Sequence, residues 1–292
     1  MMNKKHAYLI IAHNEFELLK ALLISLDYKD NDIYLHIDKK VGDINALEFQ
    51  KCLNHSTLYM LEQRMDVQWG NYSQIACELL LLKVASKNHY KYYHLCSGVD
   101  LPLKSQDEIH RFFDLHAGKE FVQFEGRSLS NEERYRISKY HFVVKRKRNL
   151  FEKVVYHTLL MFQFAIDRTK KNNWEYVKGA NWFSITDELV RFVLDSEEVI
   201  AKAFKYTRCA DEIFLQTLVY NSKFRERLYN QAFDDDYSAI CYEIDWNRGN
   251  PYTYRNEDFP MLMNSSQLFA RKFSWNQDCT VIKRIVDHVS CK

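Results

Sequence analysis

The most constraining feature of this chain is a series of short apolar runs, each of which ends in a polar cluster and leads into a helical pattern. Residues 7–12 (AYLIIA) are continuously apolar, as in a strand that is buried on both faces. His13 and Asn14 follow directly, and residues 16–26 then place apolar side chains at helical spacing. Residues 33–37 (IYLHI) begin the same order again. Alternating strands and helices of this kind predict a parallel α/β sheet.

The rest of the chain continues this α/β pattern without a visible domain boundary. We expect residues 1–292 to form one domain with a mostly parallel central sheet flanked by helices, and with a basic, amphipathic excursion at about residues 128–178. Further strands are expected at residues 57–61, 92–96, 121–124, 182–185 and 239–244, and helices at residues 44–53, 72–85, 150–166, 187–194 and 211–220.

Several function classes are disfavoured by what the sequence lacks. The net charge is only +2, so no nucleic-acid partner is expected. Neither a GxGxxG loop nor a GxxxxGK[ST] loop is present, which disfavours a dinucleotide fold and a P-loop. The seven cysteines form no CxxC pair, which favours reduced thiols in the cytoplasm. No signal peptide and no apolar run of about 18 residues is seen, so we expect a soluble or peripheral protein.

Three predicted strand ends carry polar residues. They are His13 with Asn14, Asp38, and the segment 97–100 (SGVD). Ligands of open parallel sheets bind beyond the carboxyl ends of the strands, so we expect these ends to converge on one cleft. In SGVD the glycine allows the backbone to approach a ligand, and the aspartate offers a carboxylate to sugar hydroxyls. The same residues would also suit an ordinary turn whose aspartate caps the next helix.

Five motifs in chain order carry a resemblance to a known family. They are AHNE (12–15), HIDKK (36–40), QWGNYSQI (68–75), SGVDLPLKSQDEI (97–109) and FARKF (269–273). Together they resemble the core-2/I-branching glycosyltransferases, glycosyltransferase family 14, which include branching N-acetylglucosaminyltransferases, peptide O-xylosyltransferases and many bacterial members. The resemblance covers almost the whole chain and implies a GT-A-type, Rossmann-like nucleotide-sugar fold.

The resemblance also implies a reaction. It is an inverting transfer of a sugar, GlcNAc or xylose, from a UDP-sugar to a hydroxyl of a glycan or lipid-linked acceptor, with no metal or other cofactor. In the family, the segment matching residues 97–102 replaces the usual Asp-x-Asp metal motif, and basic residues of the segment matching 269–273 hold the diphosphate. Here those residues are Arg271 and Lys272. A guanidinium and an ammonium would stabilise the charge that develops on the leaving diphosphate. Without the other motifs, the pair would read as a solvated surface pair.

The resemblance assigns the catalytic base to Glu212. The family has an Asp-Glu pair that opens a helix, with the glutamate as base, and Asp211-Glu212 matches that pair. An inverting transfer needs one carboxylate to take the proton of the acceptor hydroxyl. Asp211 would then cap the helix or orient the acceptor. Alternatively, both acids simply complement the helix dipole.

Aromatic and glycine residues complete the assignment. Trp182, beside a glycine-led strand, would stack on the acceptor sugar, and Trp69-Gly70 resembles a loop on the donor side; either tryptophan could equally be core. Arg248 is a second phosphate ligand by a looser match. The expected donor-binding residues are His13, Asn14, Asp38, Trp69, Gly70, Ser97, Gly98, Asp100, Arg248, Arg271 and Lys272, and the acceptor-binding residues are Asp211 and Trp182.

A rival metal site exists at Asp234-Asp235-Asp236, which has an Asp-x-Asp spacing. It lies outside the position of the family's motif, in an expected loop. We interpret it as solvated loop charge and expect no metal ligand there.

The excursion carries seven Lys or Arg and no acidic residue between positions 134 and 148, followed by the apolar and aromatic stretch 150–166. This combination suits peripheral contact with an anionic membrane at the inner face of the cell, near a lipid-linked acceptor. A helix packed on the sheet with a solvated basic face would give the same pattern. Bacterial relatives favour a role in surface polysaccharide synthesis. The alternative function is a non-catalytic carbohydrate- or polyanion-binding module on the same fold.

Overall fold

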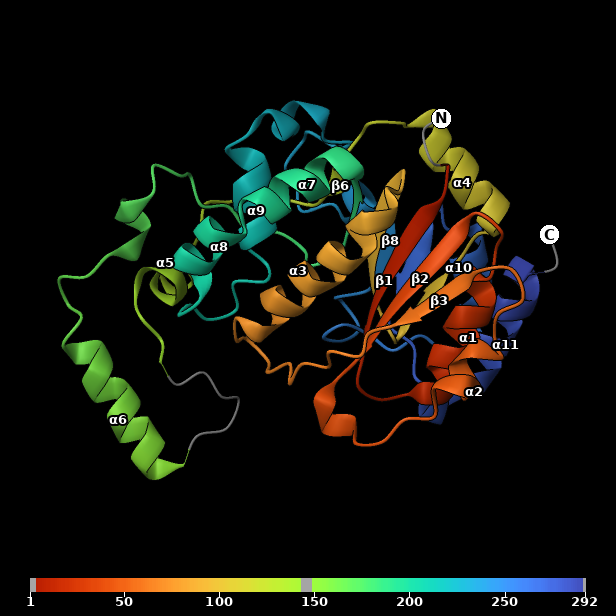
Figure 1. The fold of residues 1–292 in the computed structure, drawn as a ribbon, viewed down its shortest axis with the longest axis horizontal. Helices are drawn as coiled ribbons and strands as arrows, with labels where there is room; N and C mark the ends of the chain where they lie inside the picture. Colours follow the sequence, from red (N-terminus) through yellow and green to blue (C-terminus); the bar gives the residue numbers. More distant parts are fainter. Residues whose placement is uncertain (1–3, 143–148, 291–292) are drawn as a thin grey trace.

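The computed structural model describes residues 4–142 and 149–290, which Figure 1 shows as a ribbon. At its centre lies a six-stranded sheet in the order β3-β2-β1-β4-β7-β6. The strand pairs β1–β2, β1–β4 and β2–β3 are parallel, whereas β7 runs antiparallel to β4 and β6. The predicted α/β class with a mostly parallel sheet is therefore confirmed. The strands are β1 (His6–Ala12), β2 (Asn31–Ile37), β3 (Thr57–Met60), β4 (Tyr92–Ser97), β6 (Phe121–Val122) and β7 (Phe183–Thr186).

Helices cover both faces of this sheet, which explains why the sequence of β1 is continuously apolar (Figure 1). Tyr8 and Ile10 enter one core, to which α1 and α11 contribute. Ala7 and Leu9 enter a second core on the opposite face, to which α3, α7 and α9 contribute. The helices of the two faces are α1 (Phe16–Leu26), α2 (Ala46–Gln50), α3 (Ser73–Ala85), α4 (Gln106–Leu115), α7 (Asp187–Asp195), α8 (Glu197–Phe204), α9 (Phe214–Tyr220), α10 (Phe259–Asn264) and α11 (Trp275–Ser290).

A second, three-stranded sheet was not expected from the sequence. It has the order β5-β9-β8, with β5 (Asp100–Pro102) antiparallel to β9 (Phe269–Arg271) and β8 (Tyr242–Ile244) parallel to β9. In this register Asp100 lies opposite Arg271. The small sheet thus joins the segment that follows β4 to a segment near the end of the chain.

Two predicted elements begin three residues later than expected. The helix predicted from residue 211 begins at Phe214, because the carbonyl of Glu212 accepts a hydrogen bond from the Gly179 amide and the preceding residues form a turn. The strand predicted from residue 239 begins at Tyr242, because a 3-10 turn precedes it and Cys241 has a left-handed backbone, with φ of 59°. The 3-10 turns are Lys39–Val41, Ser86–Asn88, Arg168–Lys171, Lys223–Arg227, Tyr237–Ile240 and Asn256–Asp258.

The stretch predicted as an excursion contains α5 (Asn131–Ser138) and α6 (Leu150–Met161) between β6 and β7. In Figure 1, α6 lies at the lower left, well away from the sheet. The basic segment 134–148 is only partly covered, since its residues 143–148 lie outside the described part. Among the described cysteines, all six are free thiols, and Cys291 lies outside the described residues.

Candidate active site

The carboxyl ends of β2, β1 and β4 lie side by side, because these strands are neighbours in the sheet and run parallel. The polar residues that follow them, His13, Asn14, Asp38 and Ser97, therefore come to one edge, as the sequence predicts. His13 and Asn14 are exposed there, whereas Asp38 is buried.

Asp38 organises the loop that leads to Trp69. Its carboxylate accepts hydrogen bonds from the amides of Lys40, at 2.8 Å, and Val67, at 3.1 Å. Arg64 supports the same loop by donating to the carbonyl of Asp38 at 2.8 Å. Asp38 is thus a buried residue that holds the backbone of the loop at the edge of the site.

The predicted loop 97–100 is held against the sheet by close packing and a buried carboxylate. A Cβ on Gly98 would lie 2.8 Å from the Cβ of Ala12, so only glycine fits between the strand ends. The side chain of Asp100 is 1% exposed, and it accepts hydrogen bonds from the Ser97 amide at 2.7 Å and from Arg271 at 2.6 Å. Burial raises the pKa of Asp100, and the neighbouring Arg271 charge opposes that rise. Asp100 is therefore a buried partner of Arg271.

Arg271 is fixed on two sides. Its Nη1 donates to Asp100, and its guanidinium lies 4.2 Å from the centre of the Trp182 ring. The Trp182 ring in turn lies 6.1 Å from that of Tyr242 on β8. Within the described chain, the buried Nε of Arg271 has no hydrogen-bond partner. The pair and the stack set the orientation of the guanidinium.

Lys272 follows Arg271 and differs from it. No ion pair or side-chain hydrogen bond of its ammonium is seen with another described residue. Ser274 lies two residues after Lys272. Its hydroxyl donates a hydrogen bond to the Glu15 carboxylate at 2.7 Å, and the Trp275 amide donates to the same carboxylate at 2.9 Å. These bonds tie the loop of His13 and Asn14 to the segment that carries Lys272.

Glu212 lies in the turn before α9, with a side chain that is 43% exposed. Its carbonyl accepts from the Gly179 amide at 2.9 Å, and its carboxylate lies 3.5 Å from the Lys178 ammonium. Partial burial raises the pKa of Glu212, and the charge of Lys178 opposes that rise. A partly exposed carboxylate with a raised pKa beside one cation is suited to accept a proton.

Asp211 is placed differently from Glu212. Burial raises the pKa of Asp211 to about 7, and the charge of Glu212 adds to the rise. Burial likewise raises the pKa of Glu78, on α3, to about 8, with the charge of Asp211 contributing. No side chain caps α9, so the capping role considered for Asp211 is not seen.

A five-residue segment, 178–182, connects Glu212 with Arg271. Lys178 contacts the Glu212 carboxylate, and Trp182 stacks on Arg271. Even if fully extended, these residues span no more than about 14 Å. One short segment therefore contacts both the candidate base and the candidate diphosphate ligand.

Two glutamines that sequence reasoning missed hold this segment. Gln123 accepts from the Ala180 amide at 2.7 Å, and Gln216 donates to the Ala180 carbonyl at 2.6 Å. A Cβ on Gly179 would lie 1.8 Å from the Gln123 carbonyl oxygen, so glycine is required there. Lys178 was also missed, although it begins the KGANWF segment. The sequence signal that could have revealed Lys178 is its place directly before a glycine, just ahead of a predicted strand.

Trp69 and Gly70 lie against the segment that leads into the turn carrying Glu212. Trp69 is 59% exposed and lies near the guanidinium of Arg208. The Gly70 carbonyl accepts from the Cys209 amide at 2.8 Å, and a Cβ on Gly70 would meet the Cys209 sulfur at 2.9 Å. The loop expected on the donor side thus contacts the segment that leads into Asp211 and Glu212.

Arg248 is engaged within the protein. It forms ion pairs with Asp245 at 2.5 Å and Asp258 at 2.8 Å, and it stacks on Tyr252 at 3.9 Å. A phosphate contact by Arg248 would compete with both carboxylates.

The three aspartates of the rival metal motif shape a loop. Asp235 accepts from the Gly126 amide at 3.1 Å, and Asp236 caps the turn that begins at Tyr237. No group of three or more metal-ligating side chains is found in the described ranges.

One family model matches most of this chain, and several curated proteins are similar to it. The model described as Core-2/I-Branching enzyme matches residues 6–267. Xylosyltransferase 2 of Rattus norvegicus is 22% identical over 97% of this chain and 33% of its own length. Xylosyltransferase 1 of Homo sapiens is 20% identical over 91% of this chain and 28% of its own length. The chain thus spans about a third of the length of these curated relatives. The crystal structure of mouse xyloside xylosyltransferase 1, apo form, matches with a TM-score of 0.40 and 12% identity, covering 91% of this chain and 96% of that one.

Proposed function

The chain belongs to the Core-2/I-branching family of glycosyltransferases, and from that premise we propose that it transfers a sugar from a UDP-sugar to a hydroxyl group with inversion and without a metal ion. GlcNAc and xylose are the donor sugars that we propose, the latter in keeping with the relatives named xylosyltransferases. We propose a glycan or lipid-linked acceptor in bacterial surface polysaccharide synthesis.

The observation that carries this proposal is the segment 178–182. It joins a proton-accepting carboxylate, Glu212, to a positioned guanidinium, Arg271. Glu212 takes the proton of the acceptor hydroxyl while that oxygen attacks the anomeric carbon from the face opposite the diphosphate. Lys178 opposes the rise in the Glu212 pKa that burial causes, and so favours the ionised carboxylate.

Arg271 and Lys272 act on the leaving group. Negative charge grows on the diphosphate as the glycosidic bond breaks, and fixed cations stabilise that charge. Asp100 and Trp182 hold the guanidinium in place before the substrate arrives, so little reorganisation is needed. Lys272, with no internal partner among the described residues, is available to pair with a phosphate oxygen.

The test is donor turnover by the purified chain in EDTA. UDP-GlcNAc and UDP-xylose are compared with GDP-mannose for thermal stabilisation and for release of the nucleoside diphosphate, with water and a panel of glycan hydroxyls as acceptors. We expect one UDP-sugar to stabilise the protein and to be turned over in EDTA. Loss of turnover in EDTA would contradict the metal-free mechanism. Stabilisation without turnover under every condition would favour the non-catalytic binding module.

Peripheral contact with an anionic membrane is the second part of the proposal. Helix α6 and the residues after it expose large apolar side chains, including Phe151 at 76% and Phe164 at 88%. The sequence just before α6 reads Lys145-Arg146-Lys147-Arg148, outside the described residues. Exposed aromatic residues beside a run of cations suit the surface of an anionic bilayer. Among the described helices, none has the length and apolar character needed to span a bilayer.

Vesicle flotation tests this contact. We expect the chain to float with vesicles containing phosphatidylglycerol and not with pure phosphatidylcholine. The variant Phe151→Asp with Phe164→Asp should lose flotation. Leu115→Asp, on α4 and 77% exposed, is the control and should keep it. Flotation that is independent of anionic lipid or of Phe151 and Phe164 would refute the proposal.

A further inference from the structure

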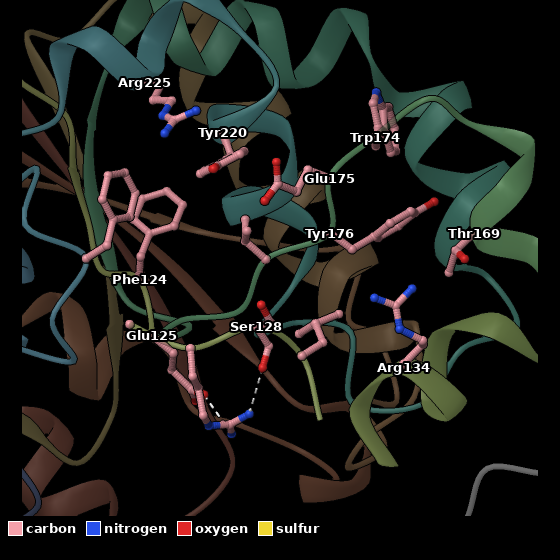
Figure 2. Close-up of a pocket in the computed structure, with 15 residues that line it drawn as sticks. Phe124, Glu125, Ser128, Arg134, Thr169, Trp174, Glu175, Tyr176, Tyr220 and Arg225 are labelled. Carbon is pink, nitrogen blue, oxygen red and sulfur yellow. Dashed lines mark hydrogen bonds and ion pairs between the residues drawn. The ribbon is translucent and has the colours of Figure 1, made fainter. Parts of the chain in front are cut away.

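A pocket of about 570 Å³ is lined by residues of the segments 124–129 and 174–177, among others (Figure 2). Glu125 lines it, and the Glu125 carboxylate forms an ion pair with the same Lys178 ammonium that contacts Glu212. The loop of Phe233 packs closely against the next residue of the lining, since a Cβ on Gly126 would lie 2.5 Å from the Phe233 carbonyl oxygen. The pocket is therefore linked to the candidate base through Glu125 and Lys178.

Five of the fifteen residues that line this pocket are aromatic. Phe124 and Phe233 meet at 4.9 Å between ring centres, and Trp174 lies 6.1 Å from Tyr176. Flat apolar faces with a few polar groups at the edges suit a sugar ring, which has an apolar C–H face and polar hydroxyls at its rim. The pocket thus has the composition of a carbohydrate subsite.

Two arginines give the pocket its charge. The guanidinium groups of Arg134 and Arg225 form no ion pair with any described residue, although Arg225 stacks on Tyr220 at 3.9 Å. Arg127, in contrast, is neutralised by Glu133 at 2.7 Å and Glu125 at 2.8 Å. Figure 2 shows Arg134 and Arg225 on opposite sides of the pocket, with Tyr176 and Glu175 between them.

In this pocket, the Glu175 carboxylate likewise shows no ion pair with a described residue, and it can accept hydrogen bonds from sugar hydroxyls. It offsets one of the two arginine charges, so the free groups retain an excess of positive charge. A guanidinium offers a planar pair of donors that matches a carboxylate or a phosphate. Two such groups on either side of stacking faces suit a ligand with repeated acidic groups.

We infer that this pocket binds an acidic oligosaccharide as the part of the acceptor remote from the attacked hydroxyl. The inference rests on the proposed function, because it takes Glu212 as the base. It adds a substrate class, since it predicts that the acceptor chain carries carboxylate or phosphate groups one or more sugars away from the site of transfer.

Calorimetric titration of the wild-type chain with trigalacturonate and with neutral galactotriose tests this inference. We expect trigalacturonate to bind about tenfold more tightly or better, and the preference to weaken as salt is added. A phosphate-bearing trisaccharide, in a third arm, distinguishes a phosphate site from a carboxylate site. Equal affinity for the acidic and neutral sugars would overturn the inference.

Variants locate the site. Arg134→Gln with Arg225→Gln should abolish the preference for the acidic sugar and leave UDP affinity unchanged. Arg111→Gln, which removes an exposed arginine on α4, is the control. It should change neither the preference for the acidic sugar nor the UDP affinity. An unchanged preference in the double variant would refute the assignment. UDP binding and turnover are measured separately, so a failure of the proposed function would appear there, whereas a failure of this inference would appear only with the oligosaccharides.

Discussion

At the scale of single residues, the two neighbouring cations Arg271 and Lys272 have different roles. Arg271 forms an ion pair with a buried carboxylate and stacks on Trp182, so it contributes to the fold as well as to the site. Lys272 forms neither contact with the described residues. Substitution of each should therefore separate stability from ligand binding.

We expect Arg271→Ala to lower the free energy of unfolding by about 3 kcal/mol, because it leaves the Asp100 carboxyl buried without its partner. Lys272→Ala should change it by less than about 0.5 kcal/mol. The same lysine variant should weaken UDP binding about tenfold, since it removes one charged hydrogen bond. Denaturant titration and UDP calorimetry measure the two quantities. A destabilised Lys272→Ala, or one with normal UDP affinity, would contradict this division.

Lys178 is expected to control the ionisation of Glu212. Its charge opposes the rise in the Glu212 pKa that burial causes. In Lys178→Met the Glu212 pKa should rise further, so the acid limb of the pH–rate profile should move to higher pH. Lys178→Arg keeps the charge and should keep the limb near its original position. An identical limb in Lys178→Met would show that Glu212 is not the group that must be ionised.

The residue types of the site were predictable, but their partners were not. The motif order assigns Glu212 as base and Arg271 as diphosphate ligand, and both assignments stay predictions. The partner of Arg271 lies 171 positions earlier in the chain, and Glu15 contacts Trp275 across 260 positions. Such pairs depend on how the sheets pack, which local sequence patterns do not report. For the same reason Arg248 was expected to be free for phosphate, whereas Asp245 and Asp258 bind it.

At the scale of elements, the segment 178–182 is the structural link of the site. The backbone of Gly179 lies against the Gln123 carbonyl and donates to Glu212. Gly179→Ala should therefore displace Glu212 and lower the free energy of unfolding by about 3 kcal/mol. Gly118→Ala is the control, because no atom lies near the added Cβ. It should lower the free energy of unfolding by about 1 kcal/mol, owing to its positive φ alone. Turnover of both variants is measured beside denaturant titration. Full activity in Gly179→Ala would refute the positioning role.

Long, periodic elements were predicted well, and short ones were not. The helices α3 and α7 and the strands β1 and β2 have uninterrupted apolar patterns, because each buries a face or both faces in a core. The three-residue strands β5, β8 and β9 carry too few residues to show a pattern. The start of α9 was placed too early, since no local signal reveals that Gly179 takes the Glu212 carbonyl.

At the scale of the whole molecule, buried titratable groups should limit stability at both ends of the pH range. Burial lowers the pKa of His6, His94 and His110, so folding excludes their protonated forms. Burial raises the pKa of Glu120 to about 7 and that of Glu78 to about 8, so folding disfavours their ionised forms. The histidines lose stability as the pH falls below about 6.5, and the two acids lose it as the pH rises towards 8.

We therefore expect the melting temperature to be highest near pH 6, a weakly acidic optimum set by these opposing groups. Calorimetry at constant ionic strength between about pH 4.5 and 8.5 measures it. Glu120→Gln removes one ionisation and should flatten the alkaline side. A melting temperature that rises steadily up to pH 8.5, or an unchanged slope in the variant, would contradict the burial of these groups in their neutral forms.

The placement of all residues in one domain with an excursion remains a prediction. The mostly parallel sheet was predictable because its strands have uniform apolar sequences. The position of α6, away from the sheet in Figure 1, was not, since an apolar helix equally suits a place in a core. Charge and hydrophobicity indicate what a helix can contact, and tertiary packing decides whether the protein itself supplies that contact.

The central claim is that Glu212 is the base of a UDP-sugar transfer, and that other residues, Arg271 and Lys272, hold the diphosphate. The most direct test compares turnover and UDP affinity in Glu212→Gln, which preserves shape and removes the proton acceptor. We expect turnover to fall by a factor of about 100 or more, with UDP affinity and melting temperature nearly unchanged. Full turnover in Glu212→Gln would contradict the account.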